Sequence, residues 1–139
     1  FENYGQVLKE ELSGLEGLIQ FEPGRFLVAR SGVLLTQVQY IKKTPFKNFV
    51  ICNAGMNHLI RPALYQAQHR IFPLIKRDGE ILKADVVGPI CESSDFLGKN
   101  REFIGLQEGD WLAIAEAGAY GYSMVSLYNS FPLPKEIII

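Results

Sequence analysis

The stretch GPICESSD, residues 88–95, places a thiol, Cys91, directly beside a carboxylate, Glu92. It follows an apolar run over residues 84–87 that is typical of a strand. Because the Gly-Pro pair interrupts regular structure, we expect Cys91 and Glu92 on a turn at a strand end. A thiol there can act as an acid, a nucleophile or a metal ligand. The alternative is a buried structural cysteine, since free cysteines are among the most buried residues.

Composition narrows the class of protein without naming a function. The 139 residues are 47% hydrophobic and 21% charged, which is ordinary for a soluble globular domain. A net charge of -1 gives no electrostatic case for nucleic acid or an anionic membrane. No apolar run approaches the roughly 20 residues that span a bilayer. Two cysteines do not make a disulfide framework, so we expect a reducing, cytoplasmic setting.

The first part of the chain has helical periodicity. Apolar residues recur at three- and four-residue steps from Tyr4 to Leu15, which predicts an amphipathic helix that stops near Gly14. A short strand over residues 18–21 should then lead into the turn EPGR, residues 22–25, and a brief helix over residues 26–31. A helix, a strand and a polar turn in this order are typical of the last step of a (β/α)₈ barrel.

From residue 33 the pattern changes to short strands separated by turns. Pro62 suits the first turn of a helix over residues 63–67, which would place Arg61 and Tyr65 on one side. Asp78-Gly79 predicts a hairpin turn between two of the strands, and residues 100–102 are interpreted as a solvated connection. The fold class is therefore mainly β, a small barrel or sandwich. The predicted strands are 34–41, 48–52, 70–75, 81–87, 111–115 and a last one at the end of the chain.

Four motifs occur in order: EPGR at 22–25, RPALY at 61–65, GPICES at 88–93 and GAY at 118–120. Together they closely resemble the C-terminal half of the diaminopimelate decarboxylase family, alanine-racemase-fold enzymes that depend on pyridoxal 5'-phosphate. The resemblance implies a (β/α)₈ barrel that holds the cofactor, followed by a C-terminal β-barrel. Residues 1–32 would be the last helix and strand of the first domain, and residues 33–139 the second. We therefore expect a fragment of a longer chain.

The resemblance also implies roles in cofactor binding. Glu22 would hold a proton on the pyridine nitrogen, which strengthens the electron sink of the cofactor. Gly24, Arg25 and Tyr120 would lie near its phosphate. From the residues alone, exposed surface positions are the commoner interpretation of Glu22 and Arg25, and Tyr120 can be interpreted as an aromatic that closes the barrel.

The substrate implied is meso-2,6-diaminopimelate, which would be converted to L-lysine and carbon dioxide. Arg25 and Tyr120 would also contact this substrate, while Arg61 and Tyr65 would hold the carboxylate and polar groups at its far end. Glu92 would bind the distal ammonium group. A helix-start arginine with a packed tyrosine is the alternative for Arg61 and Tyr65.

Cys91 would donate the proton that replaces carbon dioxide, a catalytic role of a kind that contributes about 10²- to 10⁴-fold in rate. The family places this cysteine and its neighbouring acid in the active site of the opposite subunit, which implies a homodimer. Cys52 lies in an apolar strand and is interpreted as structural. His58 and His69 are far apart in sequence and no cysteine pair has metal-ligand spacing, so no metal site is predicted.

Departures from the family pattern leave alternatives open. The lysine that binds the cofactor covalently and the glycine-rich phosphate loop belong to the barrel domain, so this chain should be inactive by itself. Asn53 stands where Asp is usual and Ser94 where Gly is common, and Phe131 and Leu133 replace expected arginines. The alternatives are a sister decarboxylase of the same fold, acting on ornithine, arginine, carboxynorspermidine or a citryl-amino acid, and a non-catalytic regulatory paralogue.

Overall fold

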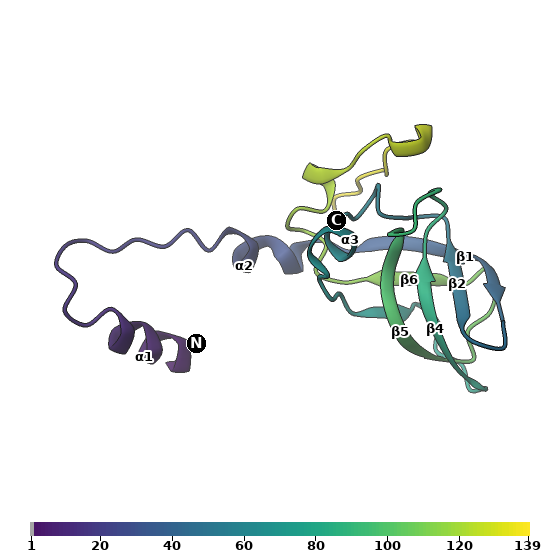
Figure 1. Cartoon of the computed structure of the whole chain (residues 1–139), viewed down its shortest axis with the longest axis horizontal. Coiled ribbons are helices and arrows are strands. Elements are labelled where there is room, and N and C mark those ends of the chain that lie inside the picture. The colour runs from purple at the N-terminus through teal and green to yellow at the C-terminus, as the bar shows by residue number, and fades with distance from the viewer. Residues whose placement is uncertain (1) are drawn as a thin grey trace.

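The computed structural model describes residues 2–139, which form a β-barrel preceded by an extended arm. The arm begins with helix α1 (Glu2–Glu11) and lies apart from the barrel in Figure 1. Helix α2 (Gly24–Val28) and a 3₁₀ turn, η1 (Ala29–Ser31), join the arm to the barrel. The other short helical elements are α3 (Arg61–Tyr65), η2 (Tyr122–Met124) and η3 (Tyr128–Ser130).

Six strands form one sheet in the order β3-β6-β1-β2-β4-β5. Only β2 and β4 pair in parallel; the other neighbours are antiparallel. The two outer strands, β3 and β5, also contact each other, so the sheet nearly closes on itself and the barrel has little exposed edge. The strands are β1 (Leu34–Lys42), β2 (Asn48–Cys52), β3 (Ile71–Pro73), β4 (Ile81–Val87), β5 (Phe96–Ile104) and β6 (Trp111–Ile114). The predicted mainly-β, barrel-type fold is therefore confirmed.

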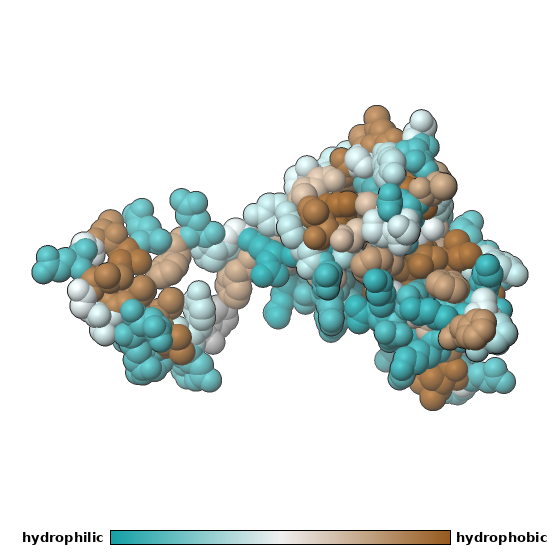
Figure 2. Space-filling model, in the orientation of Figure 1, coloured by the Kyte–Doolittle hydropathy of each residue, from teal (hydrophilic) through white to brown (hydrophobic). Residues whose placement is uncertain are grey.

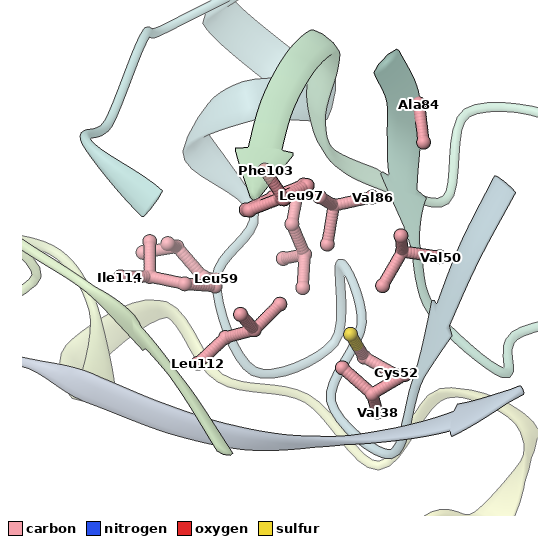
Figure 3. Close-up of a cluster of buried hydrophobic side chains, with 10 residues drawn as sticks. All are labelled: Val38, Val50, Cys52, Leu59, Ala84, Val86, Leu97, Phe103, Leu112 and Ile114. Atoms are coloured by element: carbon pink, nitrogen blue, oxygen red, sulfur yellow. The ribbon is translucent and has the colours of Figure 1, made fainter. Parts of the chain in front are cut away.

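The core fills the barrel with fully buried side chains, shown in Figure 3, and Ile71 of β3 packs against them. Burial alternates along parts of β1 and β2, whereas β4 and β6 each contain three consecutive buried residues. Cys52 belongs to this core and is fully buried; burial raises the pKa of its thiol to about 12. Its predicted structural role fits this position. The core residues are Val38, Val50, Cys52, Leu59, Ala84, Val86, Leu97, Phe103, Leu112 and Ile114.

The strand pairing differs from the sequence prediction at Asp78-Gly79, where no hairpin turn is formed. The strands on either side of it, β3 and β4, do not form a hairpin: β3 pairs with β6, and β4 pairs with β2 and β5. Residues 100–102, predicted as a solvated connection, lie inside β5. Asn100 has a left-handed backbone there (φ +52°), and its N–H is bound by the buried Asp85 carboxylate. A polar run can thus continue a strand where a bulge is anchored from the neighbouring strand.

Two other predicted strands are absent from the structure. Residues 18–21 and the last residues, 135–139, are exposed and pair with no strand in the described part of the chain. Both runs are apolar enough to be strands, but an isolated strand has no partner for its backbone hydrogen-bonding groups. Helix α1 likewise ends at Glu11, before the predicted stop at Gly14.

No element of residues 2–139 covers the apolar stripe of α1. None of its residues is buried, and Figure 2 shows hydrophobic side chains on the surface of this arm. Amphipathic helices in proteins owe most of their stability to the packing of such a stripe, and α1 lacks that packing in residues 2–139. Between residues 2 and 139, no helix is long and apolar enough to cross a membrane.

The hydrogen bonds of Asn53, directly after β2, account for the departure from the family pattern at this position. Its side-chain oxygen accepts hydrogen bonds from the Thr36 hydroxyl (2.8 Å) and the Gln37 N–H (2.9 Å). The Thr36 hydroxyl in turn accepts one from the Ala54 N–H (3.0 Å). An aspartate oxygen would accept the same two bonds, so the departure at this position preserves the bend that follows β2.

Candidate active-site residues

Arg25, Arg61 and Tyr65 line one cavity of about 230 Å³ beside the barrel. Arg25 comes from α2 and the other two from α3, so residues far apart in sequence converge here. The remaining lining residues are Ala29, Ala67, Gln68, His69 and Glu116. Two guanidinium groups, a phenol and an imidazole around a small cavity form a site suited to an anionic, hydrogen-bonding ligand.

Helix α3 presents Arg61 and Tyr65 to this cavity from one short turn. Pro62 is buried in its first turn, where a missing N–H costs nothing. Gln66 adopts a left-handed conformation (φ +54°) and its N–H returns to the Arg61 carbonyl, which ends the helix after one turn. The predicted helix thus starts two residues earlier than expected, at Arg61, and the side chains of Arg61 and Tyr65 line the same cavity.

Arg25 is held at the cavity by close contact between α2–η1 and the loop after β6. The Gly118 N–H donates to the Ala29 carbonyl (3.0 Å), and the Ala117 N–H donates to the Gly32 carbonyl (2.9 Å). A Cβ on Gly118 would collide with the Val28 carbonyl, so only glycine permits this approach. The glycine of the GAY motif therefore has a packing reason of its own.

Cys91 and Glu92 lie on an exposed turn after β4, as predicted, and the buried Asp95 shapes that turn. The Asp95 carboxylate accepts hydrogen bonds from the backbone N–H groups of Met56 and Ile90, both at 2.6 Å. It also packs where side chains on Gly55 and Gly88 would be. Burial raises the pKa of Asp95, although the two N–H groups favour the ionised form.

Glu92 is held by its own neighbours. Its carboxylate accepts hydrogen bonds from the Ser94 N–H (3.3 Å) and from the hydroxyls of Ser93 and Ser94 (both 3.2 Å). The Tyr128 hydroxyl donates to its other oxygen at 3.4 Å. These bonds, the one from the Ser94 backbone first, lower the pKa of Glu92. A glycine at position 94 would lack the hydroxyl that donates to the Glu92 carboxylate.

The other predicted site residues do not line the cavity within this chain. Glu22 and Gly24 lie just before and at the start of α2, and Tyr120 lies on the turn after Gly118. Tyr120 is half-exposed and has a left-handed backbone (φ +58°). In residues 2–139, neither the Glu22 carboxylate nor the Tyr120 hydroxyl has a hydrogen-bond partner, so both groups are free for a ligand. Their assigned roles stay predictions.

Two titratable residues of the cavity, His69 and Glu116, were not among the predicted site residues. His69 stands four residues after Tyr65 and follows the RPALY motif, and Glu116 stands two residues before the GAY motif. Nothing in their own sequence contexts marks them as functional; proximity to the motifs was the only signal. Within the described residues, no group of three or more His, Cys, Asp or Glu side chains could hold a metal ion.

Comparison with known families identifies the class of protein. The chain matches the pyridoxal-dependent decarboxylase C-terminal sheet domain over residues 25–118, and it therefore belongs to this family. The diaminopimelate decarboxylase of Vibrio cholerae is 50% identical over 137 residues, which cover 98% of this chain and 33% of that protein. This chain therefore spans about a third of the length of the curated relatives it matches.

Solved structures also resemble this chain, as two examples show. The crystal structure of diaminopimelate decarboxylase from Helicobacter pylori, in complex with L-lysine, superimposes with a TM-score of 0.79 at 50% identity. That superposition covers 94% of this chain and 32% of the other. A crystal structure from Aquifex aeolicus gives a TM-score of 0.82 at 44% identity and covers 95% of this chain and 33% of that one. The predicted resemblance is confirmed.

Proposed function

We propose that this chain is the C-terminal part of a pyridoxal 5'-phosphate-dependent decarboxylase that converts meso-2,6-diaminopimelate to L-lysine and carbon dioxide. The observation that carries the proposal is the cavity in which Arg25, Arg61 and Tyr65 meet. A decarboxylase that acts on a dicarboxylic amino acid needs a second carboxylate site away from the reacting carbon, and paired guanidinium groups bind carboxylates well. The names of the relatives support the same reaction.

The residues predicted to hold the cofactor fit such a group. Glu22 offers an exposed carboxylate without a partner in residues 2–139, and Tyr120 offers an exposed hydroxyl. The position of a Cβ on Gly24 faces open space, with no atom within 4 Å. Glu22 would hold the pyridine nitrogen in its protonated form, while Gly24, Arg25 and Tyr120 would bind near the phosphate. The cofactor, when bound, accepts the electron pair left on the α-carbon as carbon dioxide departs.

This chain's own residues would supply binding and a proton. Arg61 and Tyr65 hold the far carboxylate, which fixes the distance from that end of the substrate to the reacting carbon. Cys91 is exposed on its turn and carries the proton that the α-carbon takes up. Asp95 holds the backbone of that turn, and Glu92 offers its ordered carboxylate to the substrate's distal ammonium group.

Cys91 and Glu92 are not among the residues that line the Arg25–Arg61 cavity. A homodimer in which the turn of one subunit reaches the site of the other would bring both groups together. The uncovered apolar side chains of the arm are consistent with further contacts in the full-length protein. We propose a homodimeric enzyme, located in the cytoplasm.

The experiment is a carbon dioxide release assay on the full-length protein with pyridoxal 5'-phosphate, comparing meso-diaminopimelate with L-ornithine and L-arginine. We expect release from meso-diaminopimelate and at least 100-fold lower kcat/KM for the two monocarboxylic substrates, because neither can occupy the arginine cavity with a carboxylate. A preference for ornithine or arginine would refute the substrate assignment. No release from any of the three would favour the regulatory paralogue.

A further inference from the structure

The arginine cavity contains two buried polar atoms that have no hydrogen-bond partner in residues 2–139. One is Nε2 of His69, a residue that is only 3% exposed, and the other is Nε of Arg61. Both residues line the cavity. Buried polar side-chain atoms nearly always have a hydrogen-bond partner in native proteins, so two such atoms without partners in residues of one cavity indicate a place for a ligand group.

The hydrogen bond of His69 Nδ1 determines whether Nε2 is a donor or an acceptor. Its Nδ1 lies 2.9 Å from the Ala115 carbonyl oxygen, which can only accept, so Nδ1 carries the proton. Burial lowers the pKa of His69, and the nearby cations Arg61 and Arg101 act in the same direction against the Ala115 carbonyl and Glu116. The ring is therefore neutral near pH 7, and the buried Nε2 has a lone pair without a hydrogen-bond partner in residues 2–139.

The two unpaired atoms have opposite requirements. Arg61 Nε needs an acceptor, whereas His69 Nε2 needs a donor. A carboxylate or a phosphate satisfies the arginines and leaves His69 facing another acceptor. An ammonium group satisfies His69, and the Glu116 carboxylate on the same cavity favours a cation there despite the arginines.

We infer that His69 binds the ammonium group of an α-amino acid, whose carboxylate lies on Arg25 and Arg61, and thereby helps this cavity select a zwitterionic substrate end over a bare carboxylate. The inference rests on the proposed function and adds a specificity-determining residue to it. It is compatible with Glu92, because an ammonium group has three N–H donors and can be bound from two sides.

The test compares two ligands that differ only in that ammonium group. L-Lysine carries an α-ammonium beside its carboxylate, and 6-aminohexanoate has the same chain and carboxylate without it. Calorimetry on the full-length, cofactor-loaded protein gives the dissociation constant of each ligand for the wild type and for His69→Asn. The asparagine amide can still donate to the Ala115 carbonyl, as Nδ1 does, but offers nothing at the position of Nε2.

We expect His69→Asn to weaken L-lysine binding by about tenfold, the typical effect of one lost hydrogen bond to a charged group, and 6-aminohexanoate binding by less than twofold. His69→Gln, which can place an oxygen close to the position of Nε2, should recover part of the preference for lysine. Equal weakening of both ligands would show a purely structural histidine and overturn the inference, as would no change in either or no binding of L-lysine by the wild type.

The outcome is separable from that of the proposed function, because binding is measured without turnover. A protein that releases no carbon dioxide, but shows the ligand-dependent effect of His69→Asn, would refute the decarboxylase and keep the ammonium site. A protein that decarboxylates meso-diaminopimelate, but binds both ligands equally after His69→Asn, would keep the enzyme and refute the role of His69.

Discussion

Replacing Asp95 by asparagine should slow the enzyme by disordering the turn that carries Cys91. The Asp95 carboxylate accepts two backbone hydrogen bonds of 2.6 Å, one from the bend after β2 and one from Ile90 beside the thiol. Asparagine keeps one acceptor oxygen and turns an NH₂ group toward the other N–H. Asp95 is only 5% exposed, so the N–H that loses its acceptor has little access to water.

The size of the effect follows from these contacts. A hydrogen bond to a charged group contributes about 1.5–3 kcal/mol, and an unsatisfied buried donor costs about 1–3 kcal/mol. Part of this loss is offset, because burial of the Asp95 charge is itself unfavourable, as its raised pKa shows. We expect a net cost of about 2 kcal/mol, which corresponds to at most about a 30-fold loss in the population of the ordered turn.

The assay is kcat of the full-length Asp95→Asn protein, with urea unfolding as the measure of stability. Asp110→Asn is the matched control: Asp110 is also buried and accepts hydrogen bonds from Arg77 (2.7 and 2.6 Å) and from the Gln107 N–H (2.9 Å), but it lies away from the turn. Both variants should lose stability, and only Asp95→Asn should lose kcat by more than fivefold. A kcat within twofold of the wild type for Asp95→Asn would refute the positioning role.

Three further outcomes follow from the structure. Iodoacetamide at pH 8 should alkylate Cys91 and leave Cys52 unmodified in the folded protein, as read by peptide mass mapping, because burial raises the pKa of Cys52 to about 12; labelling of Cys52 at a similar rate would contradict its place in the core. Gly118→Ala should destabilise the protein by about 1–3 kcal/mol in urea and weaken substrate binding, because the new methyl group meets the Val28 carbonyl; wild-type behaviour would show that α2 is not held there. Since folding lowers the pKa of His69, the unfolded chain binds the extra proton below about pH 6.5, so stability should fall as the pH drops from there; a His69→Asn variant with an unchanged profile would exclude this source.

Periodicity and turn chemistry in the sequence were enough to predict most of the barrel. The alternating runs of β1 and β2, the apolar run of β4 and the proline at the start of α3 mark these elements locally. Pairing partners are not local. β3 has only three residues, and its bonds go to β6, about forty residues away, rather than to the strand that follows it. Asp78-Gly79 lies in the irregular segment between β3 and β4, where no turn is formed, and the dipeptide could not show which strands pair.

The candidate site likewise contains residues that local sequence predicts and residues that it does not. Motif order identified Arg61 and Tyr65, and helical spacing placed them on one side of α3. His69 and Glu116 are brought to the same cavity by the sheet, because the Ala115 carbonyl that binds His69 follows directly after β6. The proximity of His69 and Glu116 depends on the order of the strands in the sheet, which cannot be predicted from either residue alone. The relation of Cys91 to this cavity depends on polypeptide outside the described chain, so it stays a prediction.

The central claim is that the cavity of Arg61 holds the second carboxylate of the substrate, and a matched pair of arginine variants tests it most directly. Arg101 also has a buried Nε without a partner in residues 2–139, but it lines the neighbouring hollow, beside Phe96 and Lys99, and not the cavity of Arg61. Removing one partner of a desolvated charge pair costs about 2–5 kcal/mol. In the full-length protein, Arg61→Gln should therefore lower kcat/KM for meso-diaminopimelate by at least about 30-fold, and Arg101→Gln by less than threefold. Equal losses in the two variants, or an Arg61→Gln enzyme within threefold of the wild type, would contradict the account.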